Sequence, residues 1–447
     1  MRRWFYDVYK SRFKKLIIPL VIEQLLAVTV GFADTIMVSN VGEAAVSAVS
    51  LVDGINILLI NIFAALGTGG AVVAAQFIGQ GSHERARYSA KQLIMITAIL
   101  SAIIMLVVIA VNGTLLHLIF GDVDIDVMKN AEIYFLFSAI SYPFIALYNS
   151  GAALFRATGN SKISMVNSAI MNVINIVLNA VFIYGFQWGV FGAVLATLIA
   201  RAIACCVILY VLSHSDNELR IEDFKHWSFD RIYIRKILSI GVPSGLENGM
   251  FQFGKILVQS LIATFGTYSI AANAVSNNLA QMQIIPGMAM GLAMVTVVGQ
   301  CAGANQYDQA RYYIKKLMKI TYLSMFILIA ILLMATPLIL PFYSLSRETT
   351  DLAYQCIFLH GLIAITIWPL SFTFPNALRA ANDAKYTMIV SALSMWIFRF
   401  CLSYVLGQYM NMGLLGVWIA MFVDWGVRCI FFVWRYQSGK WMNRQLV

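Results

Sequence analysis

Long apolar stretches recur along the whole 447-residue chain, and they restrict it to one class of fold. A helix needs about 20 consecutive apolar residues to cross a bilayer. Only 12% of the residues are charged, where a soluble domain has about 25%. We therefore predict an all-α integral membrane protein with twelve transmembrane helices. The predicted spans are roughly 16–38, 46–76, 91–112, 131–154, 164–184, 189–212, 237–263, 270–299, 316–340, 352–377, 386–407 and 413–434.

Basic residues lie on alternate sides of the predicted spans. Both termini and the loops after even-numbered spans are rich in Lys and Arg, whereas the opposite loops hold Asp122, Asp124 and Asp126. Clusters of Lys and Arg mark the cytoplasmic side of a membrane. The pattern predicts a multi-pass protein of the cell (inner or plasma) membrane with both termini in the cytoplasm. It also accounts for the net charge of +10 without nucleic acid as a partner.

The second half of the chain repeats the first half about 224 positions later. QFIGQGSHERARYSAKQL (76–93) returns as QCAGANQYDQARYYIKKL (300–317), and Glu23 returns as Glu247. Each half holds six predicted spans, an even number, so both halves begin on the same side of the membrane. They are predicted to be parallel repeats, related by a pseudo-two-fold axis along the membrane normal. Duplicated halves of this length are typical of transporters.

The repeat predicts two six-helix lobes. We place an N-lobe at 1–212, a charged cytoplasmic linker at 213–235, a C-lobe at 236–435 and a cytoplasmic tail at 436–447. The linker is too short to form a third domain.

Polar residues inside the spans of the first half indicate a coupling site, because a charge in the bilayer is costly unless it faces a cavity or a partner. Asp34 lies in the first span, and its counterpart in the second half is Val258. An unpaired carboxylate at such a place favours a proton or cation site. Asn175 and Asn179 share one helix face, and Thr197 lies in the next span. These groups can join helices by hydrogen bonds, or supply the oxygen ligands that a monovalent cation prefers.

Other intramembrane charges leave two interpretations open. Glu23 and Glu247 each follow a proline by four residues, where the helix dipole favours an acid, but a coupling or gating role fits as well. Arg399 and Asp424 are expected at similar depth, either as an ion pair that fixes helix register or as a further coupling site. Lys255 has no evident partner on its own helix.

Two further residues complete this set of charges. Asp424 can also pair with Arg428 one turn further along its helix. Arg201, in the sixth span, remains without an assigned role.

The chain shows no motif for catalysis or for ATP hydrolysis. Its five His residues are scattered, and it has no HExxH, nucleophile elbow, CxxC or P-loop. Its six Cys residues lie in or beside apolar spans, so they predict neither a disulfide framework nor a metal site. We expect a protein that is not an enzyme, that needs no cofactor besides a coupling ion, and that is a monomer in the lipid bilayer.

Several segments together resemble the multidrug and toxic compound extrusion family, in particular its bacterial NorM- and DinF-like members. They are P-x3-E…DTIMVSNVG (19–42), AQFIGQG (75–81), GQCAGAN (299–305) and RATGN…N-x3-N (156–179). The similarity covers nearly the whole chain and keeps the order of the motifs. It implies two lobes around a central cleft. It also implies a secondary antiporter that exports cationic or amphiphilic drugs in exchange for Na+ or H+.

The resemblance further implies a cation site inside the N-lobe. By motif position the site falls on Asp34, Asn175, Asn179 and Thr197, with the Ala193 carbonyl nearby. Some members carry a second aspartate where this chain has Asn179. We therefore expect a site with one carboxylate, and favour Na+ slightly over H+.

Some members of the family instead couple through an acid on the seventh span. Glu247 is the only acid there, and Glu23, Lys255, Arg399 and Asp424 are further candidates for coupling or gating. The alternative function is a flippase or exporter of a lipid-linked precursor or an endogenous metabolite. Such a protein would use the same two lobes with a larger, cationic cleft.

Overall fold

The chain folds into helices throughout the part that the structure describes. In this computed structural model, no strand occurs among the described residues. The fold divides into two compact units, Met1–Gly245 and Leu246–Val447. The predicted all-α, two-lobe architecture is thereby confirmed. The described residues are 2–121, 124–214, 218–221, 228–343 and 345–443, with side chains described from residue 15 onwards.

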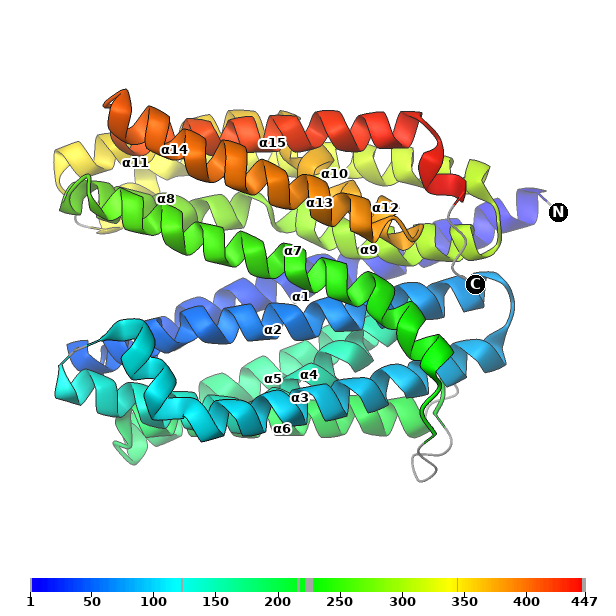
Figure 1. The fold of residues 1–447 in the computed structure, drawn as a ribbon, viewed down its shortest axis with the longest axis horizontal. Helices are drawn as coiled ribbons and strands as arrows, with labels where there is room; N and C mark the ends of the chain where they lie inside the picture. The colour runs from blue at the N-terminus through cyan, green and yellow to red at the C-terminus, as the bar shows by residue number, and fades with distance from the viewer. Residues whose placement is uncertain (1, 122–123, 215–217, 222–227, 344, 444–447) are drawn as a thin grey trace. The chain divides into compact units, whose positions relative to one another are not determined.

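Unit 1 is a bundle in which long helices run alongside one another (Figure 1). Its centre is α4, which packs against α2, α3, α5 and α6, while α1 packs mainly against α5. Phe63, Phe135 and Tyr142 are fully buried between α2 and α4. The helices are α1 (Arg2–Ser39), α2 (Glu43–Gly79), α3 (His83–Phe120), α4 (Ile125–Ala157), α5 (Ser161–Asn179), the π-helical η1 (Ala180–Gly185) and α6 (Gly189–His214).

The first part of α7 (Arg231–Ala263) also belongs to unit 1. It passes so close to α2 that a Cβ on Gly69 would lie 2.5 Å from the Ile237 carbonyl oxygen and 2.8 Å from the Gly241 nitrogen. Small residues allow such close packing of membrane helices. The boundary between the units therefore falls inside α7, later than the linker predicted at 213–235, of which residues 215–217 and 222–227 lie outside the described residues.

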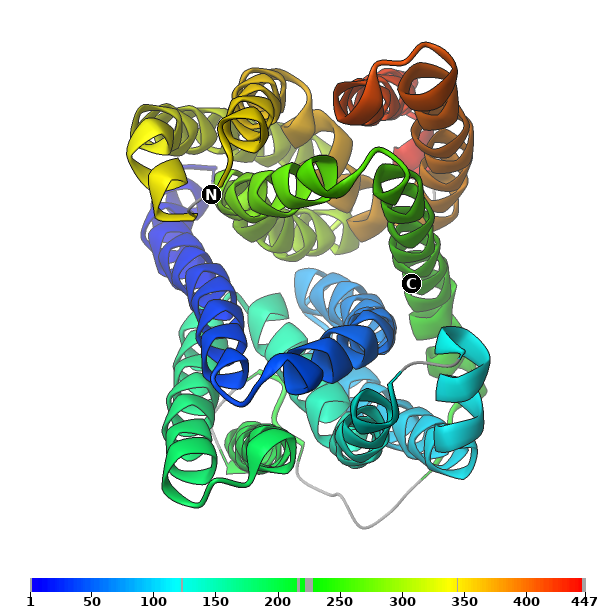
Figure 2. The same ribbon diagram turned by 90° about the vertical axis from the view of Figure 1, so that its left-hand side faces the viewer.

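Unit 2 is built from shorter and more broken helices. The bundle is seen nearly end on in Figure 2. Here α8 packs against α11, α9 against α10 and α12, and α15 against η3, η4 and η5. The elements after α7 are α8 (Thr267–Gln283), α9 (Ile285–Gly303), α10 (Tyr307–Ile339), η2 (Leu340–Tyr343), α11 (Arg347–Thr366), η3 (Pro369–Thr373), α12 (Pro375–Ala380), α13 (Ala384–Ser394), η4 (Met395–Cys401), α14 (Leu402–Tyr404), η5 (Val405–Tyr409), α15 (Gly413–Gln437) and η6 (Lys440–Asn443).

The sequence repeat reappears in the backbone conformation. The π-helical segment η1 ends four residues before α6, and its counterpart η5 ends four residues before α15. Gly189 and Gly413, which begin those two helices, both have φ of 56°. Gly42 and Gly266, before α2 and α8, have φ of 135° and 96°. Glycine takes positive φ without steric cost, so these turns explain why glycine stands at the same place in both halves.

Among the described residues, ten helices are long and apolar enough to cross a membrane, and Arg347–Thr366 with Pro369–Ala380, bent by 61°, makes an eleventh if the pair is one span. Pro369 begins the second arm at that bend, where proline removes a backbone donor. The predicted span 270–299 is divided into α8 and α9 near Pro286, and α9 alone is long enough. Of the twelve predicted spans, the remaining one is α7, which carries Glu247 and Lys255 and is too polar to qualify by composition.

Candidate coupling site

One line of hydrogen bonds joins three helices of unit 1. The Asn179 amide of α5 donates to an Asp34 carboxylate oxygen of α1 at 2.7 Å, and to the Asn175 amide oxygen at 3.2 Å. The Asn175 amide donates to the Thr197 hydroxyl of α6 at 3.1 Å, and that hydroxyl donates to the Ala193 carbonyl at 3.1 Å. The structure therefore brings together all five residues of the predicted N-lobe site.

This line contains an oxygen that is free to bind a ligand. The Asn179 Oδ1 atom is buried and has no hydrogen-bond partner among the described residues. A buried polar atom left unpaired costs about 1–3 kcal/mol. The π-helical η1 begins directly after Asn179, and such segments often occur at functional sites. The Asp34 carboxylate, the Asn179 amide oxygen and the Thr197 hydroxyl are all hard oxygen donors, so this set fits a monovalent cation.

A second polar network lies in the same unit, and its acid is not among the residues predicted from the sequence. Asp53 of α2 accepts hydrogen bonds from the Tyr134 hydroxyl at 3.3 Å and from the Asn56 amide at 3.4 Å. The Tyr142 hydroxyl donates to the Asn56 amide oxygen at 2.7 Å. Asp53 stands inside the predicted span 46–76. The criterion that selected Asp34, a carboxylate within an apolar span, would also have selected it.

The two networks of unit 1 interact electrostatically. Asp34 is close enough to Asp53 and Arg201 to feel the charge of both. Arg201 of α6 donates from Nη1 to the Ser141 hydroxyl of α4 at 2.6 Å, which fixes the guanidinium in the interior. Arg201 thus acts electrostatically on both carboxylates without an ion pair to either among the described residues, so a proton or a cation at Asp34 changes the charge balance of this group.

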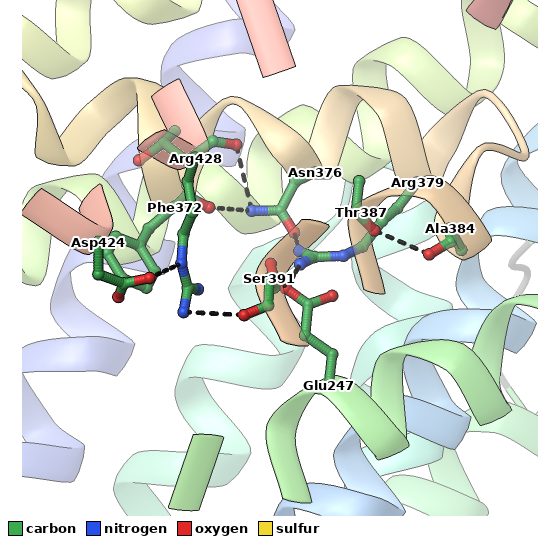
Figure 3. Close-up of polar contacts among 10 residues, drawn as sticks. Glu247, Phe372, Asn376, Arg379, Ala384, Thr387, Ser391, Asp424 and Arg428 are labelled. Atoms are coloured by element: carbon green, nitrogen blue, oxygen red, sulfur yellow. Dashed lines mark hydrogen bonds and ion pairs between the residues drawn. The ribbon is translucent and has the colours of Figure 1, made fainter. Parts of the chain in front are cut away.

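Glu23 and Glu247 occupy equivalent ion pairs in the two units. Glu23 pairs with Arg156 at 2.9 Å and accepts a hydrogen bond from Ser164 at 2.7 Å. Glu247 pairs with Arg379 at 2.6 Å and accepts one from Ser391 at 2.6 Å (Figure 3). Each pair joins the first helix of a half to the fourth and fifth helical regions of the same half. This geometry gives both acids a structural role.

Asp424 pairs with Arg428 on its own helix, at 2.9 Å (Figure 3). It also accepts a hydrogen bond from Ser394 at 2.5 Å. Among the described residues, no ion pair joins Arg399 to Asp424, so of the two partners considered for Asp424 the structure confirms Arg428 and not Arg399. Arg428 stands one helical turn after Asp424 on α15, and its guanidinium therefore reaches the carboxylate. The Arg399 guanidinium instead lies 5.0 Å from the centre of the Phe251 ring.

The described residues contain no group of three or more His, Cys, Asp or Glu side chains able to hold a metal ion. The candidate site instead offers amide, hydroxyl and carbonyl oxygens around one acid, a donor set that suits an alkali cation such as Na+ better than a transition metal. A helical membrane protein with two duplicated halves and polar groups inside its spans belongs, as a class, to the membrane transporters.

A family model confirms this class. The MatE model matches residues 19–181 and again residues 243–405, so the second match begins 224 positions after the first, as the repeat does. The chain belongs to the MatE family of transporters and is not an enzyme.

Relatives align with nearly the whole chain. An uncharacterized transporter, YisQ, of Bacillus subtilis is 29% identical and covers 95% of this chain and 94% of its own. A probable multidrug resistance protein, NorM, of Thermotoga maritima is 24% identical, and the alignment covers 97% of this chain and 93% of NorM. A solved structure described as a multidrug resistance MATE family transporter in the outward-facing conformation has a TM-score of 0.90 at 22% identity. The superposition covers 98% of this chain and 97% of that structure. This last likeness concerns the fold.

Proposed function

We propose that the protein is a secondary antiporter that exports cationic or amphiphilic drug-like molecules in exchange for Na+ or H+. Relatives described as multidrug resistance or multidrug export proteins support drug export as its activity. The duplicated halves support alternating access, in which the two lobes expose one binding region to either side of the membrane in turn.

The observation that carries the proposal is the hydrogen-bonded line from Asp34 to Ala193. It connects α1, α5 and α6, so an ion that binds at Asp34 acts on three helices at once. A bound ion can shift a conformational equilibrium only through different affinities for the two states. Here the Asn179 amide already donates to Asp34, and its buried oxygen lacks a partner among the described residues. Binding of a proton or a cation to the Asp34 carboxylate therefore directly alters the hydrogen bond that Asn179 of α5 donates to it.

Gradient-driven efflux from proteoliposomes tests the proposal. Purified protein is reconstituted with ethidium inside, and efflux is followed under a Na+ gradient alone and then under a pH gradient alone. We expect one of the two gradients to drive efflux, and Asp34→Asn to abolish it while the protein stays folded and inserted. Asp308→Asn, the same change at an exposed first-turn acid of α10, is the control and should behave as wild type.

Two results would contradict this proposal. Wild-type efflux from Asp34→Asn would remove the N-lobe site from the mechanism. No ethidium efflux under either gradient, from protein that is correctly inserted, would favour the alternative, a flippase or exporter of a lipid-linked precursor or an endogenous metabolite. The cell-membrane location, the cytoplasmic termini and the monomeric state belong to the same proposal. Each can be measured separately by labelling of single cysteines and by mass in nanodiscs.

A further inference from the structure

Three cationic side chains gather on one aromatic ring in the interior of unit 2. The distances to the centre of the Phe251 ring are 5.7 Å from the Lys255 Nζ atom, 5.0 Å from the Arg399 Cζ atom and 5.5 Å from the Arg428 Cζ atom. Arg428 also lies 5.4 Å from the centre of the Phe372 ring. The cations come from three separate elements, α7, η4 and α15. The cluster therefore exists only because the fold assembles it.

Only one of these three charges is neutralised by an acid. Asp424 pairs with Arg428, and its paired oxygen also accepts the hydrogen bond from Ser394. Arg428 donates in addition to the Ser391 carbonyl at 3.3 Å (Figure 3). Among the residues that the structure describes, neither Lys255 nor the Arg399 guanidinium has an ion pair or a side-chain hydrogen bond. Two positive charges thus lack an ion-pair partner among the described residues, and Asp424, already paired with Arg428, acts on Arg399 only from a longer distance.

The aromatic ring alone does not stabilise two such charges. A cation–π contact contributes about 0.5–2 kcal/mol, whereas a charge inside a membrane costs several kcal/mol unless it is paired or hydrated. Both side chains are half-buried, and none of their nitrogens is among the fully enclosed polar atoms. The donors of Lys255 and Arg399 therefore remain reachable, and a ligand can approach them.

We propose that unit 2 contains a binding site for an amphiphilic oxyanion, with a phosphate or carboxylate group held by Lys255 and Arg399. A guanidinium can bind such a group through two parallel hydrogen bonds, and an ammonium adds a compact charge. The apolar part of the ligand would lie against the aromatic side chains beside the cations. Phe251 and Phe372 line the cluster there, with ring centres 6.1 Å apart, and both are partly exposed. Trp368 and Trp425 pack against Phe372, with ring centres 5.1 and 5.8 Å from it, and are themselves buried.

This site differs in charge from the candidate coupling site of unit 1, which has an excess of carboxylate over guanidinium. Binding of the oxyanion follows from the geometry of unit 2 alone. That the oxyanion is also transported rests on the proposed antiport. The two statements are tested separately, because binding can be measured without an ion gradient.

The binding test uses three small probes on the full-length protein in phosphatidylcholine nanodiscs. Phenyl phosphate carries the oxyanion and a ring, phenyltrimethylammonium carries the opposite charge on the same ring, and inorganic phosphate carries the oxyanion alone. Calorimetry gives the affinities, and the rise in Tm gives an independent measure of binding. We expect phenyl phosphate to bind at least about tenfold more tightly than phenyltrimethylammonium, which corresponds to about 1.4 kcal/mol.

Variants assign the binding to the cluster. Arg399→Gln and Lys255→Gln should each weaken phenyl phosphate binding about tenfold or more, whereas Lys255→Arg keeps the charge and should retain most of the affinity. Lys440→Gln is the matched control, because Lys440 also lies over an aromatic ring, 5.7 Å from the centre of Trp434, but is exposed. It should bind as wild type. Asp34→Asn should also bind phenyl phosphate normally, even if it loses efflux.

The source of the oxyanion is decided by competition. Displacement of phenyl phosphate when the nanodiscs contain phosphatidylglycerol would identify a lipid headgroup as ligand. Displacement by inorganic phosphate would identify a soluble oxyanion. Equal affinity for the anionic and cationic probes would overturn the proposal. Unchanged phenyl phosphate binding in both Arg399→Gln and Lys255→Gln, each eluting as a single species, would overturn it as well. If the wild-type protein shows no gradient-driven efflux, the antiport is contradicted, but the binding of the oxyanion in unit 2 is not.

Discussion

The buried pair between Glu247 and Arg379 allows a sharp test of how a carboxylate is held in this fold. Their side chains are only 9% and 15% exposed, and the shortest N–O distance is 2.6 Å. Arg379→Gln would leave the Glu247 carboxylate with Ser391 as its remaining donor. Removing one partner of a buried pair costs about 3–5 kcal/mol, because the other charge stays buried. For Arg379→Gln we expect a loss of about 3 kcal/mol in the free energy of unfolding, the lower end of this range, because both side chains keep some exposure.

Glu247 and Arg379 differ in the hydrogen bonds that each keeps when its partner is replaced, and this difference predicts the order of stability of the variants. Arg379 also donates to the Asn376 amide oxygen at 2.8 Å, so Glu247→Gln leaves the guanidinium with a hydrogen bond. One oxygen of Glu247 is already buried without a partner among the described residues. Glu247→Gln should therefore cost less than Arg379→Gln. The double variant should be more stable than Arg379→Gln, because it removes the unpaired charge.

Thermal unfolding in dodecyl maltoside micelles, followed by the fluorescence of the nine tryptophans, measures these differences. For a unit of about 200 residues, about 3 kcal/mol corresponds to a Tm lower by roughly 6–12 °C. Arg156→Gln, the equivalent change in unit 1, should lower Tm in the same way, because Glu23 is also held by an arginine and a serine.

The outcome also separates a structural role of Glu247 from a coupling role. If Arg379→Gln unfolds no earlier than Glu247→Gln, or the double variant is less stable than Arg379→Gln, the buried charge does not dominate and our reasoning fails. Glu247→Gln that keeps the wild-type Tm but loses gradient-driven efflux would instead make Glu247 a coupling acid.

Three other changes test the interior of unit 1. Asp53→Asn should keep the fold, since the amide oxygen can still accept from Tyr134, but should lower the affinity for the coupling cation roughly five- to tenfold, measured as the Na+ or H+ dependence of efflux. Asn179→Asp adds a second carboxylate beside Asp34 and should strengthen efflux driven by a pH gradient relative to a Na+ gradient; an unchanged ratio would contradict this. Gly69→Val should lower Tm by several degrees, because its Cβ would lie 2.5 Å from a carbonyl oxygen of α7.

Much of the fold could be predicted from the sequence because its signals are local. Each helix satisfies its backbone hydrogen bonds within its own segment, so the length of an apolar stretch is enough to identify a span. The repeat was equally visible, and it returned in the family match and in the positive φ of Gly189 and Gly413. The five residues of the candidate coupling site followed from motif position. The structure then joined them by hydrogen bonds.

Side-chain partners were decided only by the tertiary structure. Asn179 and Asp34 are separated by 145 positions, and Arg379 and Glu247 by 132. Such pairs depend on how each helix is rotated about its axis and which helix it packs against. The sequence offered both Arg399 and Arg428 as partners of Asp424, and only the structure shows that Arg428 forms the pair while Arg399 lies with Lys255 beside Phe251. The sequence by itself determined which charges enter the membrane. Packing between distant helices decided which of them are neutralised, because a charge acts only on the groups that the fold places within a few ångströms.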